Sequence, residues 1–549
     1  MCTERALSTF RLVMWLRPSL AGAVVFAGLA GAQAALAPGG LKAGAAARVV
    51  NPSKPAATIG HRVMRLFDNV YCDLRVQALV LEDQRGKRAA WLGCDFCVLH
   101  HSVVDRMKKE IQQKHGIEPA AVCINASHTH SAPPLTEGEA VLPEHFDPQY
   151  ADFVVRQAVA AVGDAVGRLV PAWLRYVEDA SKIAYNRRVY DAQGRHVRDH
   201  CPYPPGVTDP SVQVVVAEAA DDGRMIGLAV KFAGHPVNVV NLGIGSDFPG
   251  FTRRSLEKRH PGAVAVFLQG CCGDLVARRP NETMTGFAPS SIEMAEALGG
   301  ELAESVERAV KKPGTPIAGP IEAELREIQL PLGKLPAEEY DEAARHNDAF
   351  SGAWGKMYSE MLRRGRKIPE TWPYRLQAFR LGAGKTPFTL VALDGEVFCE
   401  YGLNLRQMLG PATTIVLGYS NGVVTYLPTA KAIRDGGYEP NAFRWWRLPG
   451  PFTPECESLV LKAATALARP KDRARQGRLE SKHGDGDAPG AAEIRLVEAG
   501  RSDYAIVIAR SANGSGNWTN HANADTLLVE VDADEVHGFK LRLSVLPTF

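Results

Sequence analysis

The sequence predicts an α/β protein: a large multilayer domain around a mixed sheet, followed by a small β-rich C-terminal tail. Three observations support this fold class. Strand-like apolar runs alternate with amphipathic helical segments from about residue 57 to residue 467. The composition, 46% hydrophobic and 23% charged over 549 residues, is that of an ordinary globular chain with room for more than one domain. Residues 470–490 then interrupt the alternation with a charged segment rich in Gly and Pro.

Each predicted element follows from its residue spacing. Strands are short apolar runs bounded by turn residues, and helices place apolar residues on one face at every third or fourth position. In chain order, we expect strands at 74–81, 88–93 and 121–125, helices at 101–115 and 148–168, a strand leading into His235, a strand at 263–268, and tail strands at 505–509 and 527–531. Helices that alternate with strands in this way favour helical layers packed on a sheet.

The N-terminus has the features of an export signal. Basic residues precede an apolar stretch at 20–30, and small-x-small cleavage sites end near Ala34 and Ala37. An uncleaved anchor is the alternative, but the stretch is shorter than the ~20 residues that a membrane span needs. We therefore expect a secreted or periplasmic protein. The expected segments are a signal peptide at 1–37, the main domain at 38–468, a linker at 469–491 and the tail at 492–549.

The charge balance and the cysteines exclude several classes of protein. The net charge is +2, from 63 basic and 61 acidic residues, which argues against a nucleic-acid partner. Ten cysteines over a chain of this size do not form a disulfide scaffold. Cys94 and Cys97 have CxxC spacing but no second pair, which disfavours a zinc ribbon. Two packing thiols, or one disulfide in an exported protein, remain as interpretations.

The strongest local signal is the segment 125–133, which reads Asn-Ala-Ser-His-Thr-His-Ser-Ala-Pro. His128 and His130 follow the carboxyl end of the strand predicted at 121–125. In extended backbone, residues i and i+2 lie on the same side, so two imidazoles can meet a metal or its bound water. Two surface histidines in a loop are the alternative, and the pair alone does not decide between these interpretations.

Three further polar residues also stand where a strand or turn ends. His235 follows an apolar strand and precedes a proline, although a core histidine bonded to a carbonyl gives the same pattern. Asp247 opens a predicted helix. Asp274 ends the turn Gln-Gly-Cys-Cys-Gly-Asp, whose glycines let a ligand approach the backbone closely. For both aspartates a helix N-cap is the alternative.

Taken in order, these segments resemble the neutral (non-lysosomal) ceramidase family. The motifs are Asn-x-Ser-His-Thr-His-Ser-x-Pro, Phe-Ala-x-His, Ser-Asp-x-x-Gly and Gln-x-x-x-Gly-Asp. Several weak motifs in one fixed order are more specific than any single motif. The resemblance runs from about residue 57 to residue 467. It implies a ceramidase-like catalytic domain that hydrolyses an amide bond, such as that of an N-acyl sphingoid lipid, at a Zn²⁺ site with two His, one Glu and one Tyr ligands.

The resemblance also implies a role for individual residues. The zinc ligands that it implies are His128, His235, Glu396 and Tyr426. His130 would support catalysis without binding the metal, and Arg187 would contact the substrate or the developing oxyanion. From the chemistry of such sites we further expect Asp247 and Asp274 to orient the ligand imidazoles.

Ordinary alternatives exist for the residues outside the His motifs. Arg187 has the features of a surface residue, and Glu396 stands where a turn leads into a helix. Tyr426 has the features of a strand aromatic, and Tyr419 and Tyr438 lie close enough in the sequence to take its place as the fourth ligand.

Two departures from the family pattern bear on the substrate. The family's Gly-Asp turn continues into a Ser-Pro pair, whereas Val276 stands at the Ser position here and has no hydroxyl. A serine acyl-enzyme at this position is therefore excluded, although a mechanism based on zinc-activated water does not need that serine. The C-terminal tail is also shorter than the family's β-sandwich. Both departures weaken the assignment of ceramide itself as the substrate.

The expected chemistry is coherent for such a site. Zinc would lower the pKa of a bound water to about 7, His130 would act as general base and then acid, and Arg187 would stabilise the oxyanion by roughly 3 kcal/mol. The expected partner is a small-molecule or lipid amide, with contact to a membrane surface as a further expectation. The alternatives are a zinc hydrolase of other esters or glycoconjugate substituents, and a non-catalytic ligand-binding relative.

Overall fold

The computed structural model describes residues 40–60, 65–135, 145–346, 351–383 and 387–469, and four strands of the tail. The expected signal peptide, residues 1–37, and nearly all of the expected linker, residues 469–491, lie outside the described residues. Their boundaries stay predictions. None of the described helices is both long and apolar enough to cross a membrane.

The largest sheet has nine strands and mixes parallel with antiparallel pairs. Its order is β15-β13-β12-β8-β1-β5-β6-β7, and β17 pairs with β8. Only β6–β7 and β13–β15 are parallel. The strands are β1 (Lys42–Val49), β5 (Arg75–Glu82), β6 (Arg88–Cys94), β7 (Val122–Ala126), β8 (Val170–Ala180), β12 (Ser211–Ala219), β13 (Met225–Phe232), β15 (Val264–Gln269) and β17 (Thr315–Ile317).

A second sheet of four strands has the order β18-β19-β20-β22. Its strands are β18 (Ile321–Pro331), β19 (Thr371–Leu381), β20 (Phe388–Leu393) and β22 (Thr414–Leu417). Short pairs join the loops: β2 (Ala56–Ala57) with β3 (Leu66–Phe67), β4 (Val70–Cys72) with β14 (Ile244–Gly245), β9 (Ala184–Asn186) with β16 (Leu275–Ala277), β10 (Val189–Tyr190) with β11 (His196–Arg198), and β21 (Glu396–Val397) with β23 (Tyr426–Leu427). The tail forms its own sheet from β24 (Glu493–Glu498), β25 (Ala505–Arg510), β26 (Thr526–Asp534) and β27 (Gly538–Leu546).

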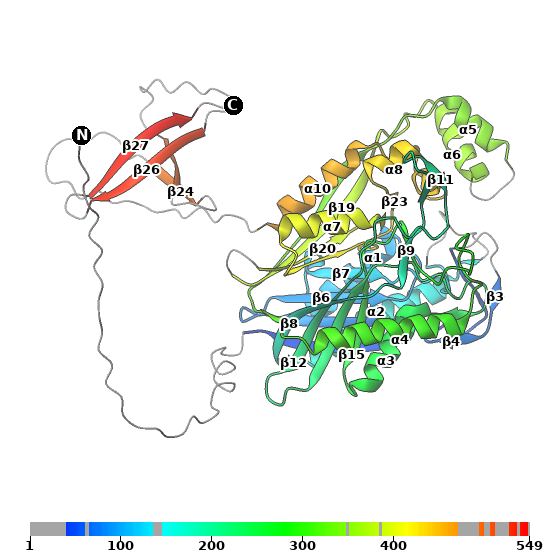
Figure 1. The fold of residues 1–549 in the computed structure, drawn as a ribbon, viewed down its shortest axis with the longest axis horizontal. Helices are drawn as coiled ribbons and strands as arrows, with labels where there is room; N and C mark the ends of the chain where they lie inside the picture. The colour runs from blue at the N-terminus through cyan, green and yellow to red at the C-terminus, as the bar shows by residue number, and fades with distance from the viewer. Residues whose placement is uncertain are drawn as a thin grey trace, which may run out of the picture.

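Helices cover the outer faces of these sheets (Figure 1). Helix α2 packs on β1 and β5, α3 and α4 pack on β12 and β15, and α7 and α10 pack on β19, β20 and β22. The helices are α1 (His101–His115), α2 (Pro148–Gly167), α3 (Asp247–Arg259), α4 (Ile292–Val310), α5 (Ala337–Ala344), α6 (Ser351–Arg363), α7 (Cys399–Leu409), α8 (Ala430–Asp435), α9 (Tyr438–Asn441) and α10 (Glu455–Ala468), with 3₁₀ turns at Pro119–Ala121 and Ala442–Arg444. The described part of the chain is thus an α/β fold, as predicted.

The central core lies between the sheets. In β5, Leu79 and Leu81 face this core while Val76 and Val80 face the helices, as the two-residue period of a strand requires. Side chains from the second sheet complete the central core, for example Phe379, whose ring meets that of fully buried Trp91 edge-on at 6.0 Å. Both faces of β5 are therefore buried.

The start of α2 shows why this helix begins where it does. The Asp147 carboxylate accepts hydrogen bonds from the backbone N–H groups of Gln149 and Tyr150, and Pro148 occupies the first helical turn. These are the residue types that satisfy the free N–H groups of a helix start.

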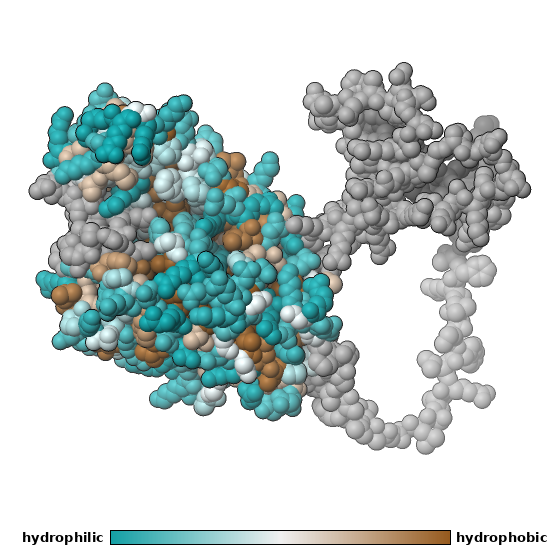
Figure 2. Space-filling model, turned by 180° about the vertical axis from the view of Figure 1, so that it is seen from behind, coloured by the Kyte–Doolittle hydropathy of each residue, from teal (hydrophilic) through white to brown (hydrophobic). Residues whose placement is uncertain are grey.

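The surface is mostly polar. Figure 2 shows hydrophilic residues over most of the visible face, with hydrophobic residues scattered among them.

Candidate metal centre and active site

His128 comes from the loop after β7, beside the loop after β6. The parallel pairing of these strands continues past their ends, because Ser127 N–H donates to the Cys94 carbonyl and His128 N–H to the Phe96 carbonyl. His128 itself has φ of 67°, in the left-handed region that non-glycine residues avoid. The extended backbone that we assumed for the His-Thr-His pair is therefore wrong at His128: a kink, not strand alternation, directs the ring. Such strain is typical of functional sites.

His235 follows β13 and is held from the neighbouring turn. Its backbone N–H donates to the Leu275 carbonyl at 3.0 Å. Its ring Nδ1 lies 2.7 Å from the carbonyl oxygen of Cys272. In the same way, Nδ1 of His128 lies 2.7 Å from the carbonyl oxygen of Cys97. A carbonyl oxygen only accepts, so each Nδ1 carries the proton, and a neutral ring then presents an unprotonated Nε2.

Glu396 meets both Nε2 atoms. It stands on β21, after a turn in which Gly395 has φ of 83°, a conformation that favours glycine. Its Oε2 lies 3.1 Å from Nε2 of His128 and 3.1 Å from Nε2 of His235. All three side chains are buried. Carboxylate and neutral Nε2 are both acceptors, so a proton or a cation has to lie among the three atoms.

The electrostatics favour positive charge at this point. Burial opposes ionisation of Glu396, but His128 and His235 beside it lower its pKa well below the ordinary value. Burial, and then Arg187, lowers the pKa of His235 to about 4. Burial also disfavours a charge on His128, yet Cys97 and Glu396 raise its pKa to about 10. The positive charge that balances the Glu396 carboxylate therefore lies on the imidazole of His128.

The three residues fit a divalent metal. The ligand atoms of His128, His235 and Glu396 all lie within 4.8 Å of one another. Two ligand atoms bound tetrahedrally to one zinc, each at about 2.0–2.2 Å, lie roughly 3.4 Å apart, close to the 3.1 Å between Glu396 Oε2 and each imidazole. Two imidazoles and a carboxylate are a common donor set for zinc. The structure thus brings together three of the four predicted ligands.

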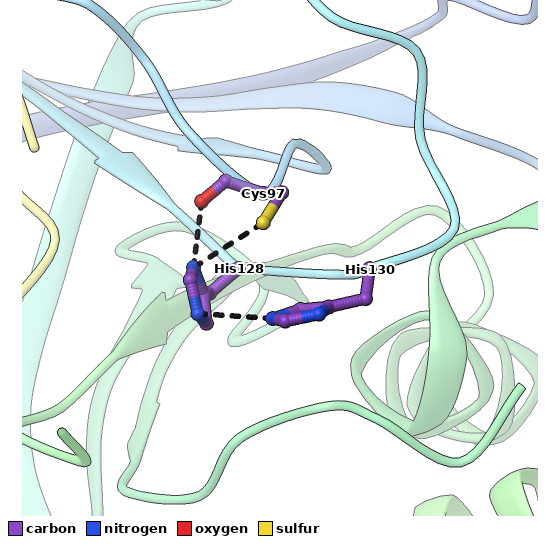
Figure 3. Close-up of side chains that lie close together, drawn as sticks. All are labelled: Cys97, His128 and His130. Atoms are coloured by element: carbon purple, nitrogen blue, oxygen red, sulfur yellow. Dashed lines mark hydrogen bonds between the residues drawn. The ribbon is translucent and has the colours of Figure 1, made fainter. Parts of the chain in front are cut away.

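His130 lies beside this triad. Its Nδ1 is 3.0 Å from the Gly60 carbonyl, so the proton is again on Nδ1. Its Nε2 lies 3.2 Å from Nε2 of His128 (Figure 3). His130 is only partly buried, in contrast to its two imidazole neighbours. It is therefore placed between the triad and the surface.

Arg187 is buried and held on three sides. Its Nε donates to Glu439 at 3.0 Å, and its Nη2 donates to the Gly273 carbonyl at 2.8 Å and to the Tyr426 hydroxyl at 3.1 Å. The alternative of a surface residue is excluded by these contacts and by its exposure of 4%. Its guanidinium lies 5.6 Å from the ring centre of Tyr426.

Two tyrosines border the triad. Tyr426 is the register partner of Glu396 in the pair β21–β23, and its ring is parallel to that of His235 at 6.5 Å between centres. Tyr419 also lies here: its hydroxyl donates to Glu396 Oε2 at 3.4 Å and its ring is 4.4 Å from that of His128. Tyr438 lies farther out, with its ring 5.7 Å from that of Tyr426.

Asp247 and Asp274 are not where the sequence argument expected them. The expectation that they hydrogen-bond the imidazoles is wrong, because the carbonyls of Cys97 and Cys272 take that place. Asp247 accepts from the backbone and side-chain amides of Asn238, and so fixes the loop after His235.

Asp274 fixes a different segment. Its carboxylate accepts from Asn186 at 2.9 Å and from the Cys399 N–H at 2.8 Å, and burial raises its pKa to about 6. Its own carbonyl accepts from the Arg187 N–H. Asp274 therefore positions the segment that carries Arg187.

Val276 stands on β16, beside the backbone of His235. It forms a parallel bridge with His235 and is buried. No hydroxyl is present at this position, in line with the exclusion of a serine acyl-enzyme there. The nine described cysteines are all free thiols, so the disulfide allowed by the spacing of Cys94 and Cys97 is not formed.

Sequence reasoning missed the counter-charge of the arginines. Glu439 is 1% exposed and accepts from both Arg187 and Arg188. The signal was present in the Arg-Arg pair, since two buried guanidiniums need a buried carboxylate, but nothing in the spacing says that it lies about 250 residues away.

Comparisons with known proteins agree with this architecture. Residues 70–291 match the family model described as neutral/alkaline non-lysosomal ceramidase, N-terminal. That range includes His128, Arg187 and His235 but not Glu396 or Tyr426. No curated protein matches the sequence.

Two solved structures share the fold. The neutral ceramidase from Pseudomonas aeruginosa is 16% identical, with a TM-score of 0.58 over 78% of this chain and 74% of that chain. A ceramidase complexed with C2 is also 16% identical, with a TM-score of 0.57 over 83% of this chain and 84% of that chain. Together with the motifs and the family match, these findings confirm that the chain resembles the neutral/alkaline non-lysosomal ceramidase family.

Proposed function

We propose that this protein is a secreted, zinc-dependent hydrolase that cleaves the amide bond of an N-acyl, ceramide-like lipid. One observation carries the proposal: three buried acceptor atoms, from His128, His235 and Glu396, meet where only a proton or a cation can reconcile them. The family match over residues 70–291 and the shared fold support hydrolysis.

Zinc is the metal that suits this donor set best. His128, His235 and Glu396 would hold it, with Tyr426 as the fourth ligand. When bound, zinc supplies a Lewis acid that polarises the amide carbonyl and makes water nucleophilic at neutral pH. The carbonyls that accept from each Nδ1 keep both imidazoles in the tautomer that binds metal through Nε2.

His130 has the position of a general base and acid. The Gly60 carbonyl fixes its proton on Nδ1, so Nε2 is the atom that accepts a proton from the attacking water. Returning that proton to the leaving amine completes the cycle. The unperturbed pKa of an imidazole, about 6.5, suits both transfers near neutral pH.

Arg187 would stabilise the oxyanion. Glu439 and the Gly273 carbonyl hold its guanidinium rigidly, so little reorganisation is needed when charge develops. One such donor is worth roughly 3 kcal/mol. The contact with Tyr426 couples its position to the ligand sphere.

The proposed substrate class is supported by a relative. One solved structure of the same fold is a ceramidase complexed with C2, which supports a lipid amide as the substrate class. We extend this to action at a membrane surface, reached after export through the predicted signal at 1–37. Substrates with a long acyl chain, offered in vesicles and in solution, test this extension.

Metal analysis and one substitution test the proposal. Purified protein should contain about one zinc per chain. His235→Ala should lose the zinc and the amidase activity together, because it removes a ligand. The matched control is His260→Ala, because His260 is a partly exposed histidine bonded to Glu307. This variant should keep both the zinc and the amidase activity.

Two results would oppose the proposal in different ways. Full zinc occupancy in His235→Ala would show that the ligand assignment is wrong. Zinc bound by the wild type without turnover of any amide, ester or sugar conjugate would instead favour a ligand-binding relative.

A further inference from the structure

A second group of metal-ligating side chains shares His128 with the triad. The ligand atoms of Cys97, His128 and His130 also lie within 4.8 Å of one another. Figure 3 shows the three side chains converging from the loops after β6 and β7. The proposed function uses only two of them, and it leaves the thiol of Cys97 without a role.

The folding of the two loops explains why the thiol is there. The loop after β6 runs beside the loop after β7, with His128 N–H donating to the Phe96 carbonyl. This brings the Cys97 carbonyl to 2.7 Å from Nδ1 of His128 and the Cys97 Sγ to 3.8 Å from the same atom. The side chain of Cys97 is 3% exposed. The thiol therefore borders the imidazole that the triad needs.

The two groups differ in chemical softness. His128, His235 and Glu396 offer two nitrogens and a carboxylate oxygen, a set that suits zinc. Cys97, His128 and His130 offer a sulfur and two nitrogens. Thiolate sulfur is a soft ligand and selects thiophilic cations such as Cu⁺.

We propose that Cys97, His128 and His130 form a second, inhibitory site for a thiophilic cation such as Cd²⁺ or Cu⁺. The two groups compete, because His128 belongs to both. A cation bound to the Cys97 group through Nε2 of His128, the nitrogen that faces both Glu396 and His130, takes that nitrogen from the triad and occupies His130. The Cys97 thiol proton leaves to the solvent as the sulfur binds.

The distances allow this with small movements. A sulfur at about 2.3 Å and a nitrogen at about 2.1 Å, bound tetrahedrally to one cation, lie roughly 3.6 Å apart. The three ligand atoms lie within 4.8 Å of one another, so movements of at most about 1 Å bring them to a common cation. His130 is the least buried of the three, so its ring has the most room to move.

Titration of the purified, zinc-loaded full chain with cadmium chloride tests the proposal. We expect a thiolate-to-cadmium charge-transfer absorption that saturates near one Cd²⁺ per chain, with release of about one zinc. Cys97→Ser should lose the absorption and bind Cd²⁺ at least ~10-fold more weakly. Cys201→Ser, a buried thiol near the Met284 carbonyl, should behave as the wild type.

An unchanged absorption in Cys97→Ser would overturn the proposal. If that variant does not fold, the ¹¹³Cd resonance of the wild type decides: a shift typical of one sulfur ligand supports the site, and a shift typical of nitrogen and oxygen ligands alone overturns it. Both readouts are independent of the proposed amidase activity. A protein that contains no zinc would defeat the proposed function but leave the cadmium test intact.

Discussion

Two regions of this molecule bury charge, and they do so in opposite ways. In the first, Arg253 donates to both oxygens of Asp95, at 2.7 and 2.6 Å, and the Arg75 N–H donates to the same carboxylate. Both terminal nitrogens of the Arg253 guanidinium therefore meet an acceptor in Asp95. In the second, Glu396 faces the two acceptor nitrogens of His128 and His235.

The difference shows what marks a functional site. Burial is equally deep in both regions, since Asp95 is 0% and Glu396 3% exposed. A satisfied buried pair is structural, whereas a buried cluster of acceptor atoms needs an added proton or metal cation to satisfy it. The four predictions below test this contrast.

The largest effect is expected from the satisfied pair. Asp95→Ala leaves the Arg253 guanidinium buried without its partner, which costs about 3–5 kcal/mol of folding free energy. Urea unfolding measures this loss. Glu296→Ala, which breaks the exposed pair with Arg254, should change stability little. An equally small effect of Asp95→Ala would mean that the pair is not structural.

The cluster of His128, His235 and Glu396 should not lose folding stability when its carboxylate is replaced. Glu396→Gln replaces an acceptor by a group that can donate to Nε2, so the zinc-free protein should be no less stable than the wild type. Zinc affinity and activity should fall by more than about 100-fold. Glu400→Gln is the control on the neighbouring helix. A thermal melt of zinc-stripped Glu396→Gln below that of the stripped wild type would contradict this prediction.

Arg187 combines features of both regions. Its guanidinium is paired with Glu439, as in a structural ion pair, and it also borders the His128–His235–Glu396 triad. Arg187→Lys keeps the charge but loses the forked geometry, so kcat should fall about 100-fold. Zinc content, measured in the same samples, should stay near one per chain. Loss of zinc would show that Arg187 acts through Tyr426 on the metal site instead of on the substrate.

The smallest effect is expected from the pH dependence of a second buried pair, Lys231 with Asp209. Burial raises the pKa of Asp209, but Lys231 and Ser211 outweigh it, and the pKa is lowered from its ordinary value of 3.8. The stabilisation is therefore complete above that value and is lost as the pH falls through the lowered pKa. The gap in unfolding free energy between wild type and Asp209→Asn should shrink below about pH 4. A gap independent of pH would contradict this assignment.

The strand ends were the predictable part of the site. His128 and His235 follow apolar strands, and β5, β6, β7 and the helices α1 and α2 lie where the spacing predicted. Glu396 and Tyr426 came from the resemblance alone, because a turn and a two-residue strand carry no periodicity. The packing of two sheets on one central core could not be predicted either. A buried strand is apolar on both faces, so its sequence does not say which face meets a helix and which meets a second sheet.

Other features depend on contacts that no local pattern encodes. The left-handed φ of His128 and the carbonyls that fix each tautomer are backbone properties of the folded loops. We assigned the orienting role to Asp247 and Asp274 because carboxylates commonly play it. Backbone oxygens do so here, and any residue type supplies these.

The position of Glu396 in the sequence determines when the site can be completed during synthesis of the chain. It follows His235 by 161 residues, and it reaches the imidazoles through β21, which pairs with β23. A ribosome has therefore to finish most of the domain before the last acceptor arrives. Under the proposed function, metal loading is then among the final events of maturation, and a chain cut short before residue 396 would carry both imidazoles yet never complete the proposed zinc centre.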